Sequence, residues 1–369
     1  MEAVRTKGRW HYRVGLLAAV AMVAVLLALP RPHRIAGGAA KPSGSALPAL
    51  ASVWPAAKPF PIPAVLADGS TYRPKRLLDA DTSVGTTSSA DGLRTALVVV
   101  TGGRVRTLQS ELVDHAGLFQ GIVATPDRLY WMLTSTDAAG HPTVGLWSAA
   151  RTGGPAAPFT FDVGLPLMLG SGYDLQVVDD RLYWMSSSPG AERTELRSVP
   201  LAGGRVSVET IDGAWAMSAW PWLVTAPTAT DAPMRLYNVT TRTALTVHVP
   251  AHQQISCSPA WCRIVPADAQ VPETQLVRPD GSDRRRIGVP GALPVSADVA
   301  ARDRFEPVLV PPAGSGLGAQ LVVYDLGSGR SVLVAPLVTN AYADATHLWW
   351  STGDNETLAW YGLDLRTLA

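Results

Sequence analysis

The sequence predicts an all-β fold made of short strands that repeat along the chain. After residue 64, apolar runs rich in Tyr, Trp, Val and Thr alternate with turns rich in Gly, Pro, Asp and Ser. No stretch there keeps the i, i+3, i+4, i+7 apolar spacing of an amphipathic helix over three turns. A hexapeptide also returns at intervals of about 44 residues, which is the length of one β-propeller blade. Together these observations predict a single β-propeller of seven blades.

The repeat is strongest in residues 127–132 (DRLYWM), which return as residues 180–185 and more loosely as residues 346–351 (THLWWS). A second apolar run, a turn and a third run follow each copy, as in a blade of three or four strands. We expect the aromatic residues of the copies to lie on the second strand of each blade and to pack between neighbouring sheets. With degenerate copies included, the equivalent positions are residues 85, 131, 184, 222, 262, 307 and 350. Six blades with an irregular N-terminal hairpin are the alternative.

The last repeat unit has room for only about three strands before Ala369. A segment near residues 71–78 is expected to supply either the missing strand or the first strand of the opening blade. Sharing one blade between the two ends of the chain would close the ring and leave no free strand edge.

The N-terminal region combines four basic residues with an unbroken apolar run over residues 14–29. As a helix this run would span about 24 Å, slightly less than the ~30 Å hydrocarbon core of a bilayer. Pro30 and Pro32 would end the helix because proline lacks a backbone N–H and fixes φ. We expect an uncleaved signal-anchor. Cleavage as a signal peptide, followed by secretion, is the alternative.

The chain is therefore expected to have four parts. Residues 1–13 form a cytoplasmic basic segment, residues 14–29 a transmembrane signal-anchor helix, residues 30–64 an Ala/Pro-rich spacer and residues 65–369 the propeller. Residues 1–30 carry four basic residues and one acidic residue, a net charge of +3, and the remainder carries −2. We expect a single-pass membrane protein whose C-terminal domain lies outside the cytoplasm.

The order Asp-Arg-Leu-Tyr-Trp, Gly-Leu-Trp and Gly-Gly over residues 127–154 resembles the Tyr-Trp-Thr-Asp class of propellers and the Tol-type periplasmic propellers. The resemblance covers about residues 70–369 and implies the fold. Met132 and Met185 stand where the first class has Thr, and the Asp that follows it is absent, so that class's ligand-binding features do not transfer. With its apolar segment and spacer, the chain resembles exported propeller proteins of high-GC Gram-positive bacteria. Its four Lys against 27 Arg agree with such a genome.

Cys257 and Cys262 are the only cysteines of the chain and flank a predicted turn that contains Pro259. Two cysteines across such a turn can approach to the Cα distance that a disulfide needs, and pairing is expected in an oxidising compartment. Free core thiols, or a metal or redox function, are the alternatives, although the spacing is not Cys-x-x-Cys. No cofactor and no metal site are expected elsewhere.

Two sets of residues are weak candidates for ligand binding. Trp215, Trp220 and Trp222 are candidates for a sugar-stacking platform, although core packing between blades explains such residues more often. Asp114 and His115 lie near turns on the predicted rim, where turn chemistry is the simpler explanation. No nucleophile elbow, phosphate-binding loop or His-Glu-x-x-His motif occurs in the sequence, so no catalytic residue is assigned.

The lack of a catalytic motif, together with the anchor and the spacer, indicates a non-catalytic, membrane-tethered, extracytoplasmic propeller. Its expected partners are the membrane, through the N-terminal helix, and an envelope protein or glycan. A net charge of +1 argues against a nucleic-acid partner. The alternative is a cell-envelope glycan hydrolase or lyase with its site in the central channel. Carboxylates, His or Arg converging on one mouth of the channel would favour the enzyme, whereas an apolar or Ser/Thr-lined channel would exclude it.

Overall fold

The computed structural model describes residues 47–115, 117–137, 139–188, 193–226, 233–247, 253–266, 271, 273–312, 318–354 and 356–369, without the side chain of His115. The expected basic segment, the apolar segment and the spacer up to residue 46 lie outside the described residues. No helix in the described part of the chain is long and apolar enough to cross a membrane.

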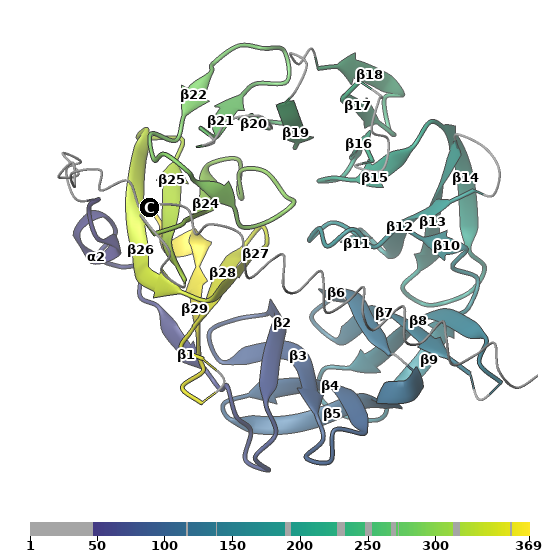
Figure 1. Ribbon diagram of the computed structural model, residues 1–369. Coiled ribbons are helices and arrows are strands. Elements are labelled where there is room, and N and C mark those ends of the chain that lie inside the picture. The colour runs from purple at the N-terminus through teal and green to yellow at the C-terminus, as the bar shows by residue number, and fades with distance from the viewer. Residues whose placement is uncertain are drawn as a thin grey trace, which may run out of the picture. The chain divides into compact units, whose positions relative to one another are not determined.

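Seven antiparallel sheets follow one another around a ring, and each sheet is one blade of a seven-bladed β-propeller (Figure 1). Blade 1 consists of β2 (Tyr72–Leu77), β3 (Thr82–Ser88), β4 (Arg94–Thr101) and β5 (Arg104–Leu112). Blade 2 consists of β6 (Leu118–Ala124), β7 (Arg128–Thr136), β8 (Pro142–Ala150) and β9 (Ala157–Thr160). Blade 3 consists of β10 (Leu165–Pro166), β11 (Leu175–Val178), β12 (Arg181–Ser187), β13 (Arg193–Pro200) and β14 (Ser207–Asp212). The short 3₁₀ helix η1 (Val113–His115) connects the first two blades.

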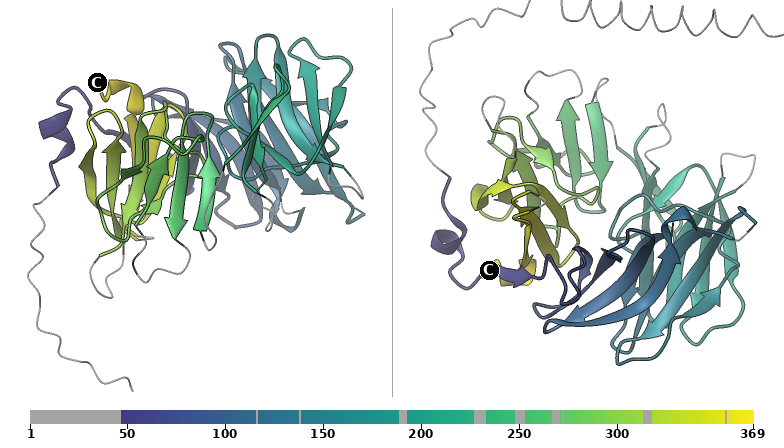
Figure 2. Two further views of the ribbon diagram at one scale, coloured as in Figure 1. Left: turned by 90° about the horizontal axis from the view of Figure 1, so that it is seen from above. Right: turned by 60° about the horizontal axis from the view of Figure 1, so that its bottom comes forward.

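Blades 4 to 7 complete the ring, and Figure 2 shows the sheets from two further sides. Blade 4 has β15 (Trp215–Met217), β16 (Trp222–Thr225), β17 (Arg235–Asn238) and β18 (Thr243–Thr246), and blade 5 has β19 (Gln253–Cys257), β20 (Cys262–Pro266), β21 (Gln275–Val277) and β22 (Arg285–Arg286). Blade 6 has β23 (Leu293–Pro294), β24 (Phe305–Val310), β25 (Ala319–Asp325) and β26 (Arg330–Val338). Blade 7 has β27 (Asn340–Ala343), β28 (His347–Thr352), β29 (Ala359–Asp364) and β1 (Phe60–Ile62). Strands β2, β6, β11, β15 and β27 lie toward the centre of the ring (Figure 1). A second 3₁₀ helix, η2 (Leu365–Thr367), follows β29.

The expected seven blades are confirmed, and the repeated positions lie on the second strand of every blade. The seven positions equivalent to Trp131 fall on β3, β7, β12, β16, β20, β24 and β28. Trp131 and Trp184 are fully buried. Trp131 packs among side chains of blades 1 and 2, and Trp184 among side chains of blades 2 and 3. The repeat therefore reflects packing between neighbouring sheets, because each large ring fills the space between two blades.

The two ends of the chain share blade 7. β1 pairs with β29 in antiparallel register, with Phe60 opposite Gly362, so the missing strand comes from residues 60–62. Residues 71–78 supply the first strand of blade 1, which was one of the two expected possibilities. A Cβ atom at Gly362 would lie 2.4 Å from the Phe60 ring and 2.8 Å from a methyl group of Leu77, so glycine gives both side chains room beside β29. Residues 47–64, which were expected in the spacer, thus belong to the propeller unit.

The short helix α2 (Leu50–Val53) and the residues around it pack against blades 6 and 7. The Trp54 ring meets the Phe305 ring edge to face, with centroids 5.8 Å apart. The backbone N–H of Leu333 donates to the carbonyl of Pro48 at 2.9 Å. The segment before β1 therefore adds apolar contacts to the two blades where the ring closes.

A disulfide joins Cys257 to Cys262, as the sequence predicted. It links the end of β19 to the start of β20, where the two residues are direct cross-strand partners with Cα atoms 4.0 Å apart. The turn between them carries Trp261, which is buried between blades 5 and 6. The disulfide therefore holds the turn that positions this ring.

Candidate binding site in the central channel

The inner strands of blades 3 and 6 are interrupted, and the interruptions extend into the central channel. In blade 3, β10 and β11 both pair with β12, and residues 167–174 leave the sheet between them. In blade 6, residues 295–304 separate the short inner strand β23 from β24. Figure 1 shows both segments reaching toward the centre of the ring from opposite sides. Residues 170–174 and 296–299 are called the channel bridge below.

Hydrogen bonds join the two halves of the channel bridge. The hydroxyl of Ser171 donates to Oδ1 of Asp298, and the backbone N–H of Gly172 donates to Oδ2 of the same carboxylate at 2.9 Å. A Cβ atom at Gly172 would lie 3.0 Å from Asp298 Oδ2, so glycine permits this approach. Because blades 3 and 6 are not neighbours in the ring, these bonds cross the channel.

A buried ion pair holds the blade 6 half of the bridge. Arg263 on β20 donates to Oε1 of Glu306 on β24 at 2.7 Å, and both side chains are almost completely buried. Arg263 also donates to the carbonyls of Ser296 and Asp298, at 2.8 and 3.1 Å. The other oxygen of Glu306 accepts the N–H of Ala300 at 2.7 Å. The pair therefore has most of its hydrogen-bonding capacity satisfied by the segment that it orders.

Backbone strain is concentrated in the same segment. Ala300, Arg302 and Asp303 all have positive φ values, between 52° and 58°. Residues other than glycine rarely adopt this left-handed backbone conformation, and they keep it only where the surrounding structure holds them in place. The Arg263–Glu306 pair and the bonds to blade 3 supply that constraint.

The channel bridge separates two cavities. The larger cavity, about 630 Å³, is lined by the inner strands of blades 1, 2 and 7 and by the bridge. The smaller one, about 100 Å³, is lined mainly by blades 3, 4 and 5 and by the bridge. Ser171, Asp174 and Ala297 line both cavities. The volume of the larger cavity lies within the range of ~300–1,000 Å³ that is typical of small-molecule sites.

Basic side chains line the blade 1 side of the larger cavity. Arg73, Lys75 and Arg76 all come from β2, which has a register shift between Pro74 and Arg76. Arg73 and Lys75 are exposed and Arg76 is half-buried, whereas Pro74 and Leu77 are buried. Strict alternation would give Arg76 the buried place, so the bulge brings a third cation to the open side of the strand. None of the three has an ion-pair partner among the described residues.

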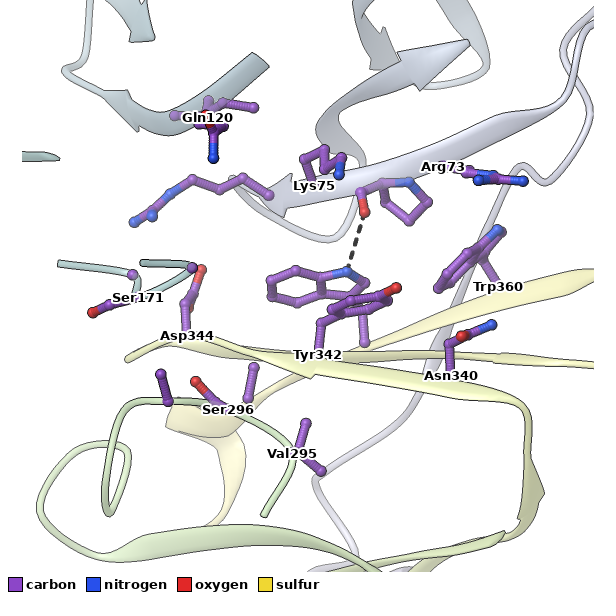
Figure 3. A pocket seen from close by; sticks show the side chains of 18 of the residues that line it. Arg73, Lys75, Gln120, Ser171, Val295, Ser296, Asn340, Tyr342, Asp344 and Trp360 are labelled. Atoms are coloured by element: carbon purple, nitrogen blue, oxygen red, sulfur yellow. Dashed lines mark hydrogen bonds between the residues drawn. The ribbon is translucent and has the colours of Figure 1, made fainter. Parts of the chain in front are cut away.

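An aromatic wall lines the blade 7 side of the cavity. Tyr342 on β27 is 45% exposed and packs against Trp349 and Trp360, with ring centroids 5.9 and 6.1 Å away. The indole N–H of Trp349 donates to the carbonyl of Pro74, so a hydrogen bond holds this wall beside the basic strand. Figure 3 shows Lys75 and Tyr342 on opposite sides of the cavity.

Three carboxylates lie near the bridge. Burial raises the pKa of Asp174 to about 7, although the N–H groups of Gly170 and Ser171 donate to it. Burial also raises the pKa of Asp298. Asp344 lines the larger cavity and lies beside Gly172 of the bridge. A Cβ atom added at Gly172 would be 3.4 Å from the Cβ of Asp344. No group of three or more His, Cys, Asp or Glu side chains in the described residues is arranged to hold a metal ion.

The structure does not bring the weak candidates from the sequence together into one site. Trp215 and Trp220 pack in the cluster around the start of blade 4, where Trp220 lies against Tyr183 with ring centroids 4.3 Å apart. Trp222 belongs to a separate cluster between blades 4 and 5. Asp114 is exposed on η1 and does not line either channel cavity, and the side chain of His115 is outside the described residues.

None of the residues that line the larger cavity is among the candidate site residues expected from the sequence. One signal was present: three of the four residues 73–76 are basic, in a chain where only 17% of residues are charged. Nothing in the sequence marked Tyr342, Asp174 or Asp298 as residues of a site, because they meet only when the ring closes.

No family model matches the sequence, and no match is found among curated proteins. Among solved structures, the chain is similar to TolB from Acinetobacter baumannii, with 12% identity and a TM-score of 0.38 over 77% of this chain and 79% of that one. It is also similar to putative TolB from Agrobacterium tumefaciens, with 14% identity and a TM-score of 0.39 over 62% and 83%. A puromycin-hydrolyzing peptidase of Mycobacterium tuberculosis has 15% identity and a TM-score of 0.49 over 88% of this chain. This chain spans 55% of that peptidase, and all three likenesses are distant and concern the β-propeller alone.

Proposed function

We propose that the protein is a non-catalytic, membrane-tethered β-propeller that binds a protein or cell-envelope ligand outside the cytoplasm. The observation that carries the binding function is the larger channel cavity. There, basic side chains of β2 that have no ion-pair partner in the described part of the chain face the aromatic wall of blade 7. A concave pocket with an apolar face and a few polar groups is the usual form of a ligand site.

Export and tethering rest on two other features. The disulfide between Cys257 and Cys262 is the pairing expected in an oxidising compartment. The basic residues and the apolar run of residues 1–29 have the composition of a signal-anchor. The proposed orientation places the propeller on the outer side of the membrane.

A cell-envelope glycan hydrolase or lyase is the second candidate, and the carboxylates near the bridge favour it. A carboxyl group with a pKa near 7, such as that of Asp174, is suited to general acid or base catalysis. However, Asp174 and Asp298 already accept backbone N–H bonds from residues 170–172, which hold the bridge in place. We therefore assign them a structural function in the binding protein.

Site-specific photocrosslinking in living cells tests where the ligand binds. A benzophenone amino acid is placed at Tyr342, in the cavity, or at Val208, which is exposed on the outer strand β14 of blade 3. We expect a crosslinked adduct from position 342 and none from position 208. Equal adducts from both positions, or an adduct from position 208 alone, would contradict a channel site.

Two further measurements separate the remaining parts of the proposal. A C-terminal alkaline phosphatase fusion should be active, and an inactive fusion at normal expression would overturn export. Incubation of the full chain with envelope glycans should release no new reducing or unsaturated ends. Release that is lost in Asp174→Asn would instead establish the enzyme.

A further inference from the structure

The larger channel cavity presents three different chemical surfaces to one ligand. Its blade 1 side is cationic, its blade 7 side is aromatic, and a buried acceptor lies between that wall and the bridge. Each surface restricts the ligand class in a different way, and the three restrictions combine.

The cationic surface favours a ligand that carries an anionic group. Arg73, Lys75 and Arg76 stand within four residues of one strand, and no carboxylate among the described residues pairs with them. Arg73 and Lys75 are exposed and Arg76 is half-buried, so the repulsion between these like charges acts largely through solvent. A carboxylate or phosphate in the cavity would relieve it and would accept charge-assisted hydrogen bonds.

The buried acceptor, Oδ2 of Asp344, favours a ligand that also carries a hydroxyl or another hydrogen-bond donor. Oδ2 of Asp344 has no hydrogen-bond partner within the described part of the chain, and this side chain is only 5% exposed. Its other oxygen is used by Thr346 and His347. Figure 3 shows the Asp344 side chain directed into the cavity, toward the side that carries Gln120. Burying an acceptor without a donor is unfavourable, so this oxygen is suited to receive a ligand hydroxyl.

The aromatic surface calls for a flat, weakly polar face. Tyr342 lines the cavity and is partly exposed, while Trp349 and Trp360, which pack against its ring, are almost completely buried. The negative face of an aromatic ring attracts C–H groups that carry a partial positive charge. A pyranose ring has such a face, with its hydroxyl groups arranged around the edge.

We propose that the larger cavity binds an acidic sugar, that is, a hydroxyl-bearing ring with a carboxylate or a phosphate. This inference rests on the proposed binding function and specifies its ligand class. The sugar ring lies on Tyr342, its anionic group contacts Arg73, Lys75 and Arg76, and one hydroxyl donates to Asp344. A peptide has no comparable combination of a flat C–H face with several hydroxyl donors.

Titration calorimetry of the full chain in detergent micelles tests the ligand class with four compounds. Trigalacturonic acid carries the carboxylate and glucose 6-phosphate carries the phosphate, so the two identify which anion is preferred. Maltotriose is the neutral match, and AMP supplies an anion with an aromatic base in place of the sugar face. We expect one of the two acidic sugars to bind at least tenfold more tightly than maltotriose and AMP, with an affinity that falls as salt is added.

Variants assign the binding to this cavity. Arg73→Gln and Lys75→Gln should each weaken binding by about 10-fold or more, the loss expected for a hydrogen bond to a charged group. Tyr342→Ala should weaken it by about threefold to tenfold, and Tyr342→Phe, which keeps the ring, should restore most of the loss. Arg104→Gln, on the outer strand β5, is the matched charge control and should leave the affinity unchanged.

The outcomes distinguish the ligand class from the binding function. Equal binding of maltotriose, tighter binding of AMP, or acidic-sugar binding that Arg73→Gln and Lys75→Gln do not weaken would overturn the inference. If no compound binds while position 342 still crosslinks in cells, the acidic-sugar class is wrong and the channel binding function stands. If position 342 also fails to crosslink, the binding function itself is wrong.

Discussion

Removing Arg263 should destabilise the propeller more than removing any exposed arginine, because its partner would be left charged inside the protein. Arg263 and Glu306 are 4% and 1% exposed, and their nearest atoms are 2.7 Å apart. In Arg263→Met, Glu306 keeps only the N–H of Ala300 as a hydrogen-bond donor. Breaking a buried pair in this way costs about 3–5 kcal/mol. The carbonyls of Ser296 and Asp298 also lose their donor, which places the expected loss toward the upper end of this range.

The assay is guanidinium unfolding of the full chain in detergent micelles, followed by tryptophan fluorescence. Arg193→Met is the matched control, since Arg193 pairs with Asp212 at 3.0 Å while both side chains are exposed. That control should lose less than about 1 kcal/mol of unfolding free energy. The double variant Arg263→Met/Glu306→Met should recover much of the loss, because no charge remains buried.

The pair of arginine variants can refute this reasoning directly. If Arg263→Met and Arg193→Met lose equal stability at unchanged m-values, the buried pair does not hold the blade 6 half of the bridge. If the double variant is no more stable than Arg263→Met, the loss comes from packing and not from an unpaired Glu306.

Three further changes test other parts of the account. Cys257→Ala/Cys262→Ala should lower the free energy of unfolding by about 2 kcal/mol, since the disulfide closes a short loop. A shift of the guanidinium unfolding midpoint no larger than that of Arg193→Met would contradict this. Asp174 binds its proton up to about pH 7 in the native state and only to about pH 3.8 when unfolded, so stability should fall as pH rises between these values. The melting temperature should differ less between pH 5 and pH 8 in Asp174→Asn than in the unmodified protein. An equal difference in both proteins would contradict the raised pKa of Asp174. Gly362→Ala should release β1 to limited proteolysis because its Cβ meets the Phe60 ring and a methyl group of Leu77. Phe60→Ala in the same chain removes the closer contact and should restore part of the protection, and no restoration would contradict the steric explanation.

The blade architecture was predictable because packing between sheets repeats along the chain. Trp131 and Trp184 occupy equivalent places on β7 and β12, so the same requirement for a large buried ring recurs in the sequence. Cys257 and Cys262 were predictable for a similar reason, since a turn of four residues brings them together without any distant contact.

The closing strand was not predictable from its own residues. β1 consists of Phe60, Pro61 and Ile62, which are indistinguishable from the proline-rich residues around them. Its partner β29 lies at the other end of the chain, so only the closed ring shows that this segment is a strand. The expected spacer boundary at residue 64 was set by composition, and composition does not report distant pairing.

The channel site required contacts that have no local signature. Gly172 and Asp298 are separated by 126 residues, and neither belongs to the repeat. The basic residues of β2 are visible in the sequence, but their place in the cavity wall depends on the bulge at Lys75 and on the place of β2 at the centre of the ring. The criterion that was expected to favour an enzyme was a convergence of carboxylates, His or Arg on one mouth of the channel. Arg73, Arg76 and Asp344 line the larger cavity, whereas Asp174 and Asp298 are hydrogen-bonded within the bridge.

Hydrogen–deuterium exchange of the full chain, with and without trigalacturonic acid or glucose 6-phosphate, tests the channel site most directly. We expect the ligand to slow exchange in β2 and β27, the strands that carry Lys75 and Tyr342. The outer strands β5 and β14 should exchange at the same rate in both states. Protection confined to the outer strands, or binding without any protection of β2 and β27, would contradict the assignment of the larger channel cavity as the ligand site.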